Sequence, residues 1–276
     1  MMNKFSFVGL VAIAVLGALL VAAIARTYRG TVTITVTAGG ACGTPSPYVP
    51  CGYTCKTAAS DEFNGTILDP TKWLANADPS LNSVSGGYAH IGVTATSHGG
   101  FTSTDAAATG NAPLYIEVRT GWSGPGLAST ATWICGSHDW TRCYGTGEAG
   151  EIDFDEVFVR DLQCVHVHYW VSGIGDVGDG GYTGAQGCIG SINIRDGNMH
   201  LLGWQILSNG TMYFRQDGQL ISSGSVNTST YPGFTKPTLG GQGGYHFITG
   251  GNCGDCGDGT IYQDFDYYRV YCLGCN

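Results

Sequence analysis

Glu151, Asp153 and Glu156 fall within one six-residue string, in a chain that contains only five glutamates. The string, residues 151–156, alternates acidic and apolar positions over its first four residues, which predicts a β-strand with one buried face and one acidic face. Glycosidic bond cleavage uses two carboxyl groups, one beside the sugar ring and one that protonates the leaving oxygen. We therefore take this segment as the candidate catalytic centre.

The phase of the strand decides which acids can work together. Residues two apart share a face and lie about 6.6 Å from each other, so Glu151 and Asp153 point the same way. Glu156 is out of phase, but one β-bulge at Phe154 or Asp155 would bring it back beside them. Without a bulge, Asp155 shares the face and Glu156 ends the strand. Like charges on one face should raise the pKa of at least one carboxyl group.

The elements that must position these acids are predicted to be strands. Charged residues make up 12% of the chain and 45 of its 276 residues are glycine, which suits a turn-rich β protein. The dipeptides Asn209-Gly210 and Asp217-Gly218 favour hairpin turns. No convincing helix follows residue 26, so a two-sheet antiparallel sandwich is the simplest architecture. Further strands are predicted at residues 115–119, 131–135, 165–171, 200–207 and 265–271.

Charge and the amino terminus limit the partners and the compartment. A net charge of −9 argues against nucleic acid and leaves a neutral polymer open. Residues 5–25 form an apolar run that fits either a signal peptide or an uncleaved anchor. We expect a hydrophobic helix within residues 1–29, a Cys/Thr/Pro/Gly-rich tether over residues 30–59, and a catalytic domain over residues 60–276. The domain would be secreted or membrane-anchored, monomeric, and in contact with a membrane only through its N-terminal segment.

Eleven cysteines agree with export, because disulfides persist in oxidising compartments. Cys135 could pair with Cys143, and Cys164 with Cys188, and the odd total leaves at least one thiol unpaired within the chain. The tail has zinc-ribbon spacing, but in an exported chain disulfides are favoured over zinc. The residues concerned are Cys253, Cys256, Cys272 and Cys275.

These motifs together resemble glycoside hydrolase family 16, which contains laminarinases, lichenases and agarases. The acidic string matches the Glu-x-Asp-x-x-Glu signature of the family, and the resemblance extends over about residues 60–272 through segments 61–73, 115–119, 199–204, 217–218 and 266–271. It implies a β-jelly-roll with an open concave substrate groove and endo-cleavage with retention of anomeric configuration. Glu151 would be the nucleophile, Glu156 the general acid/base, and Asp153 a neighbour that tunes the nucleophile.

Aromatic and polar residues near the acidic string are the candidate sugar contacts. Val165 to Trp170 alternates, so His168 and Trp170 share a face with His166. Aromatic rings stack on the apolar faces of sugars, although each tryptophan could equally pack in the core. The resemblance places His168 beside the acids, while a His-x-His metal site and a packed histidine remain alternatives. The full set is Trp133, Trp140, Tyr144, His168, Trp170 and Gln242.

The resemblance also implies a candidate stabilising calcium site at Asp266, with backbone carbonyls near Glu62 and Gly87. No cofactor is required for the chemistry. The segment 145–150 lacks the Trp-Pro that often precedes the signature in the family, so the subsites that select the polymer depart from the family pattern there. A β-1,3- or β-1,3-1,4-glucan is the leading substrate, followed by galactans. The alternatives are transglycosylation, a non-catalytic carbohydrate-binding protein, and a surface protein with an acidic calcium patch.

Overall fold

The computed structural model describes residues 42–94, 96–124, 129–136, 148–156, 164–171, 174–189, 193–236, 245–252 and 260–274. These residues belong to one compact unit, residues 39–276. The helix expected within residues 1–29 lies outside the described residues. So do Trp140, Tyr144, Gln242 and the cysteines at 143, 253, 256 and 275.

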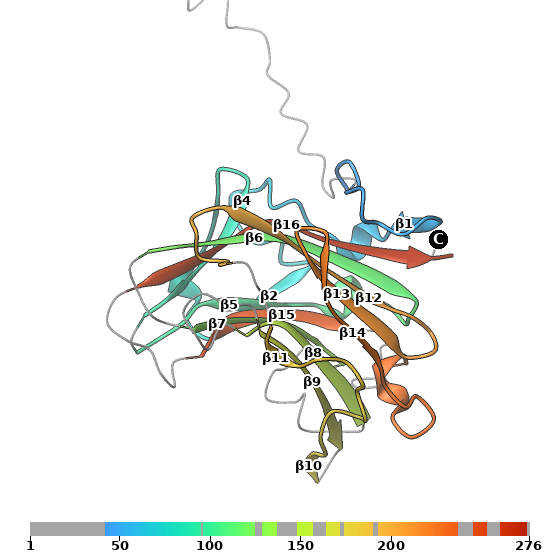
Figure 1. Ribbon diagram of the computed structural model, residues 1–276. Helices are drawn as coiled ribbons and strands as arrows, with labels where there is room; N and C mark the ends of the chain where they lie inside the picture. The colour runs from blue at the N-terminus through green and yellow to red at the C-terminus, as the bar shows by residue number, and fades with distance from the viewer. Residues whose placement is uncertain are drawn as a thin grey trace, which may run out of the picture. The chain divides into compact units, whose positions relative to one another are not determined.

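Two antiparallel sheets stack face to face and form the body of the unit (Figure 1). Sheet A runs, in spatial order, through β14 (Gln219–Ser225), β13 (Thr211–Gln216), β12 (Met199–Ile206), β6 (Leu114–Ser123), β16 (Ile261–Leu273), β4 (Tyr88–Val93) and β3 (Asn82–Ser85), with β1 (Tyr53–Cys55) paired to β16. Sheet B runs through β10 (Gly175–Asp176), β9 (Cys164–Val171), β8 (Glu148–Glu156), β7 (Ser129–Cys135), β15 (His246–Asn252), β5 (Gly100–Ser103) and β2 (Trp73–Ala75), with β11 (Gly187–Cys188) paired to β9.

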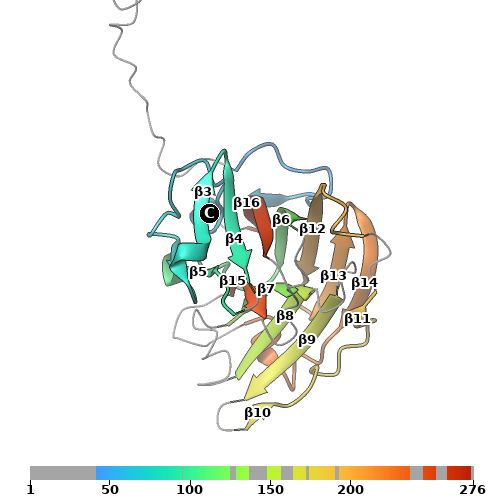
Figure 2. The same ribbon diagram turned by 90° about the vertical axis from the view of Figure 1, so that its left-hand side faces the viewer.

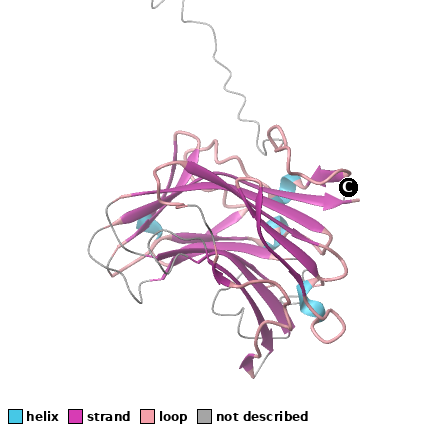
Figure 3. Ribbon diagram, viewed as in Figure 1, coloured by secondary structure: helices cyan, strands magenta, loops and turns pink. Residues whose placement is uncertain are grey.

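Helical structure in the described part of the chain is limited to four short 3-10 turns. Figure 3 draws the helices in cyan among the strands. They are η1 (Thr57–Ala59), η2 (Pro79–Leu81), η3 (Asp105–Ala107) and η4 (Pro232–Phe234). None of the described helices is long and apolar enough to cross a membrane. The all-β sandwich predicted from the sequence is therefore confirmed.

The core lies between the two sheets and consists of the inward residues of each strand. Its aromatic centre is a set of rings in mutual contact, in which Trp73 meets Phe63, Phe101, Phe247 and Tyr268 with centroids 5.0–5.9 Å apart. Large buried side chains of this kind contribute most of the apolar area removed from water, about 25 cal/mol per Å². This packing holds sheet B rigidly against sheet A.

The predicted strands and turns are present. All five further strand predictions coincide with β6, β7, β9, β12 and β16 to within a few residues. Asp217 and Gly218 join β13 to β14 with φ of 48° and 80°, which is the left-handed backbone that this dipeptide favours. The β-hairpin between β12 and β13 turns at Gly210, with φ of 84°. Local turn chemistry therefore determined both hairpins.

The segment before residue 60 packs on sheet A. A disulfide joins Cys42 to Cys55, and β1 continues the pairing of β16 through Tyr53 and Leu273. The folded unit therefore begins earlier than the predicted domain start. The predicted Cys164–Cys188 disulfide is also present and links β9 to β11.

Candidate active site

Strand β8, which carries the acidic string, pairs with β7 on one side and β9 on the other, so it lies inside sheet B (Figure 2). Glu151 and Asp153 are paired on both edges of the strand, which fixes their backbone. Gly150, directly before the string, lets β8 pass against η4, because a Cβ at this position would collide with the ring of Phe234.

A β-bulge interrupts the pairing of β8 with β7 at the predicted place. Trp133 opposes Asp153, whereas the next residue back, Thr132, opposes Asp155, so Phe154 is the extra residue. Its ring is buried and packs against Trp204 of β12 in the opposite sheet. Burial of a large aromatic side chain explains why the extra residue is held in the core. The bulged register is confirmed, and the unbulged alternative is excluded.

The bulge changes which positions of β8 share a face of the sheet. Cys135, Trp133 and Ala131, which alternate along β7, oppose Glu151, Asp153 and Glu156 in turn. The three acidic residues therefore take register positions of one phase, although five positions separate the first from the last.

Glu151 and Asp153 turn away from the core, since Ile152 and Phe154 between and beside them are part of the core cluster. Both acids are nevertheless almost inaccessible, with 7% and 2% of their surface exposed. Carboxylates are rarely buried to this degree unless neighbouring groups stabilise them.

Strand β9 supplies such a neighbour. His168 opposes Glu151 and His166 opposes Asp153 in the antiparallel register. The Nε2 atom of His168 lies 3.7 Å from Oδ2 of Asp153, and its Nδ1 atom lies 3.0 Å from Oδ2 of Asp176. The imidazole ring therefore stands between two carboxyl groups, one buried and one at the surface.

Of the other predicted sugar contacts, the structure describes two tryptophans, and the rest lie outside the described residues. Trp170 follows His168 on the same face, with ring centroids 6.3 Å apart, and both are partly exposed. Trp133 is also partly exposed and packs on Cys135 and Ile248. These two tryptophans thus flank the acids from β9 and β7. Trp140, Tyr144 and Gln242 lie outside the described residues, and the groove over this face remains a prediction.

Sequence reasoning missed Asp176. It lies in the two-residue strand β10, and its other carboxylate oxygen accepts a hydrogen bond from the Gly178 N–H at 2.8 Å. The Asp176-Val177-Gly178 pattern is typical of an Asx turn, and this was the one available signal.

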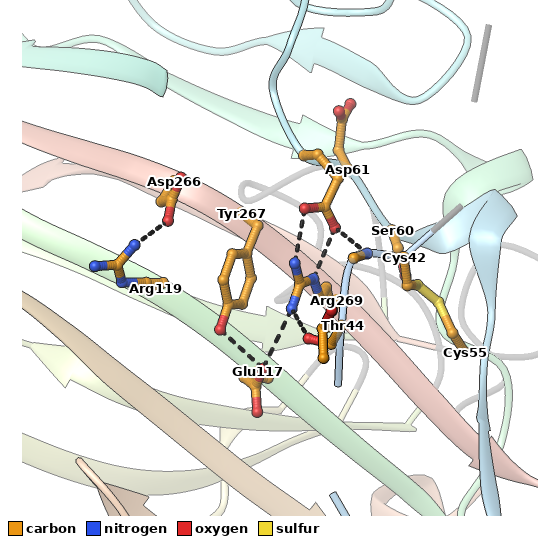
Figure 4. Close-up of polar contacts among 12 residues, drawn as sticks. Cys42, Thr44, Cys55, Ser60, Asp61, Glu117, Arg119, Asp266, Tyr267 and Arg269 are labelled. Carbon is orange, nitrogen blue, oxygen red and sulfur yellow. Dashed lines mark hydrogen bonds and ion pairs between the residues drawn. A yellow bond between two sulfur atoms is a disulfide. The ribbon is translucent and has the colours of Figure 1, made fainter. Parts of the chain in front are cut away.

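The carboxylate expected to bind calcium, that of Asp266, pairs with Arg119, as Figure 4 shows. The other expected ligands were backbone carbonyls near Glu62 and Gly87, and the side chain of Glu62 receives two 2.7 Å hydrogen bonds from the guanidinium of Arg269. Bidentate pairing of this kind satisfies both oxygens of Glu62. The guanidinium of Arg119 opposes the binding of another cation at the Asp266 carboxylate, and the calcium site with backbone carbonyls near Glu62 and Gly87 stays a prediction. Among the described residues, no group of three or more His, Cys, Asp or Glu side chains is arranged for a metal ion.

Beside Arg269, sheet A also holds a buried carboxylate that sequence reasoning did not predict. Glu117 of β6 is fully buried and accepts hydrogen bonds from the hydroxyls of Ser46, Tyr115 and Tyr267. Arg269 stacks on the Tyr267 ring, 3.6 Å from its centroid. Because Ser46 belongs to the segment closed by the Cys42–Cys55 disulfide, this cluster fastens that segment to sheet A.

Comparison with known proteins supports the same fold. No protein-family model matches the chain, and no curated protein matches it. Among solved structures, β-agarase A from Zobellia galactanivorans is similar at a TM-score of 0.59 and 18% identity, over 85% of this chain and 98% of that one. The κ-carrageenase from Pseudoalteromonas carrageenovora gives 0.54 and 18%, over 83% and 99%. The catalytic domain of an endo-1,3-β-glucanase (laminarinase) from Thermotoga petrophila RKU-1 gives 0.53 and 16%, over 81% and 99%.

The chain therefore has the jelly-roll fold of glycoside hydrolase family 16 structures, and the predicted resemblance in fold is confirmed. Its bulged acidic strand lies inside one sheet of that fold, flanked by histidine and tryptophan side chains.

Proposed function

We propose that this protein is an exported, endo-acting glycoside hydrolase that cleaves a β-linked polysaccharide with retention of anomeric configuration. The observation that carries the proposal is the β-bulge at Phe154. It aligns residues 151, 153 and 156 with three alternate residues of β7, which are positions on one face of the sheet. Retaining glycosidases hold two carboxyl groups about 5–5.5 Å apart across one sugar ring. Export is supported by the Cys42–Cys55 and Cys164–Cys188 disulfides.

In the proposed reaction Glu151 attacks the anomeric carbon while Glu156 gives its proton to the departing oxygen. The glycosyl–Glu151 ester is then hydrolysed by a water molecule, whose proton returns to Glu156. Asp153, almost fully buried between the two positions, sets the charge around the nucleophile. Trp133 and Trp170, partly exposed on either side, would stack on sugar rings.

A β-1,3- or β-1,3-1,4-glucan is the proposed substrate, and a galactan is the alternative. Structures of similar fold include both a laminarinase and enzymes named for agar and carrageenan, so the fold supports either class. Transglycosylation would follow if a sugar hydroxyl intercepted the glycosyl-enzyme in place of water.

The test is release of reducing ends from laminarin, lichenan, agarose and carrageenan by the full chain. Glu151→Gln and Glu156→Gln should each lower the rate by at least about a thousandfold while polymer binding and the unfolding temperature stay unchanged. Glu148→Gln is the matched control. Residue 148 lies in the same strand, three positions before Glu151, so its position is on the opposite face of the sheet. Full activity of either test variant would refute the assignment, and binding without cleavage of any polymer would favour a carbohydrate-binding protein.

A further inference from the structure

Asp176 contacts His168, the histidine beside the acidic strand, at one of its two ring nitrogens. Its Oδ2 atom lies 3.0 Å from His168 Nδ1, while its Oδ1 atom accepts the Gly178 N–H at 2.8 Å. The backbone of Asp176 is fixed as well, since β10 pairs with the end of β9 and Asp176 opposes Trp170. Both oxygens of this carboxylate therefore have defined partners.

These contacts determine which nitrogen of His168 carries a proton. An ionised carboxylate only accepts hydrogen bonds, so a short contact to Nδ1 requires an N–H at Nδ1. In a neutral ring Nε2 then carries the lone pair. Because Nε2 is the atom that faces Asp153 Oδ2 at 3.7 Å, the lone pair of the neutral ring points to the buried acid.

We infer that Asp176 is a positioning residue that holds His168 in the Nδ1–H tautomer and aims Nε2 at Asp153. The 3.7 Å separation is beyond direct hydrogen-bond distance, so His168 acts on Asp153 through its charge: a proton taken up at Nε2 places a positive charge beside the buried carboxyl group. Asp153 is two residues from Glu151, and His168 opposes Glu151 directly across the strands, so the charge of the ring adjusts the electrostatic environment of the nucleophile. This role rests on the proposed function, whereas the tautomer itself does not.

Asp176→Asn gives a sharp test because the Asx turn limits how the amide can sit. If its oxygen keeps the hydrogen bond from Gly178, the NH₂ group faces His168 and donates to Nδ1. The neutral ring must then carry its proton at Nε2, which is the opposite tautomer. Asp179→Asn is the matched control, because Asp179 forms the same type of turn with Gly181, at 2.9 Å, and has Gln186 as its other partner.

The first measurement is the ¹⁵N chemical shift of both ring nitrogens of His168 in the full chain, assigned by their loss in His168→Gln. At a pH where the ring is neutral, the wild type and Asp179→Asn should show the proton at Nδ1, and Asp176→Asn should show it at Nε2. The same tautomer in Asp176→Asn as in the wild type would overturn the inference, whether or not the protein has activity.

The second measurement is kcat/KM on the polysaccharide that the wild type hydrolyses. Asp176→Asn should lower it by about tenfold or more, and by less than about twofold when His168→Gln is already present, because the effect acts through the ring. Asp179→Asn should stay within about twofold of the wild type. An equal loss in both backgrounds would refute positioning. If the wild type hydrolysed none of the polysaccharides, the proposed function would be refuted instead. The measurement of the His168 tautomer would still test the contact between Asp176 and His168.

Discussion

Replacing Tyr267 by phenylalanine tests how the buried Glu117 cluster holds the N-terminal segment on sheet A. The Tyr267 hydroxyl donates a 2.9 Å hydrogen bond to Glu117 Oε1, which is fully buried. The nearest nitrogen of Arg269 lies 3.9 Å from the same oxygen, too far to replace that bond. Phenylalanine keeps the ring, and with it the stacking of Arg269, so the variant removes the hydroxyl alone.

The expected cost follows from the charge and burial of the acceptor. Hydrogen bonds to charged groups contribute about 1.5–3 kcal/mol, and a buried oxygen left without a donor cannot turn to water. The second oxygen of Glu117 keeps Ser46 and Tyr115, so we expect a loss near the lower end, about 2 kcal/mol. For a unit of this size, that loss lowers the unfolding midpoint by about 4–8 °C.

Urea and thermal unfolding of the full chain measure this effect. Tyr262→Phe is the matched control, because Tyr262 lies on the same strand, β16, but is 46% exposed. Surface substitutions of this kind change stability by less than about 0.5 kcal/mol. If Tyr267→Phe unfolded at the same midpoint as Tyr262→Phe, Glu117 would not depend on this hydroxyl, and the account of the cluster would be wrong.

Two further predictions concern the same fold. Burial and the charge of Glu117 raise the pKa of Tyr271 to about 12 and also raise the pKa values of Tyr115 and Tyr267. Their protons are held more tightly in the folded than in the unfolded chain, so this contribution is complete below about pH 10 and is lost as the pH rises towards 12. The urea midpoint should therefore fall across that range as tyrosinate absorbance appears. Separately, Cys164→Ser combined with Cys188→Ser removes the disulfide that closes a loop with a sequence separation of 24 residues. The free energy of unfolding in urea should fall by about 3 kcal/mol. Unchanged stability would show that the disulfide contributes little.

The acidic strand shows how far sequence patterns reach. Apolar and acidic alternation predicted the strand, and the five-residue offset between Glu151 and Glu156 predicted a bulge at Phe154 or Asp155. Both follow from the two-residue period of a strand, which is a local rule. The Asp217-Gly218 hairpin followed from turn chemistry for the same reason.

The partners of single charged residues were not accessible in this way. The backbone near Glu62 was expected to contribute carbonyl ligands to a calcium ion, but nothing in the sequence indicated that the Glu62 side chain pairs with Arg269, which is 207 positions away. Asp266 likewise pairs with Arg119 across β16 and β6, at the irregular register between Phe265 and Tyr267. Nothing local to either carboxylate indicates a guanidinium, because the sheet order decides which strands become neighbours.

By itself, then, the sequence determined the all-β class, the strand positions, the bulge and the order of acids along it, since each depends on residues a few positions apart. The tertiary structure decided what surrounds those acids and what fastens the chain before residue 60. His168 stands between Asp153 and Asp176 because β8, β9 and β10 are adjacent in sheet B, and Glu117 is buried because the disulfide-closed segment packs over sheet A. Such contacts arise from packing between distant segments, which hydrophobic burial stabilises and which no local pattern specifies.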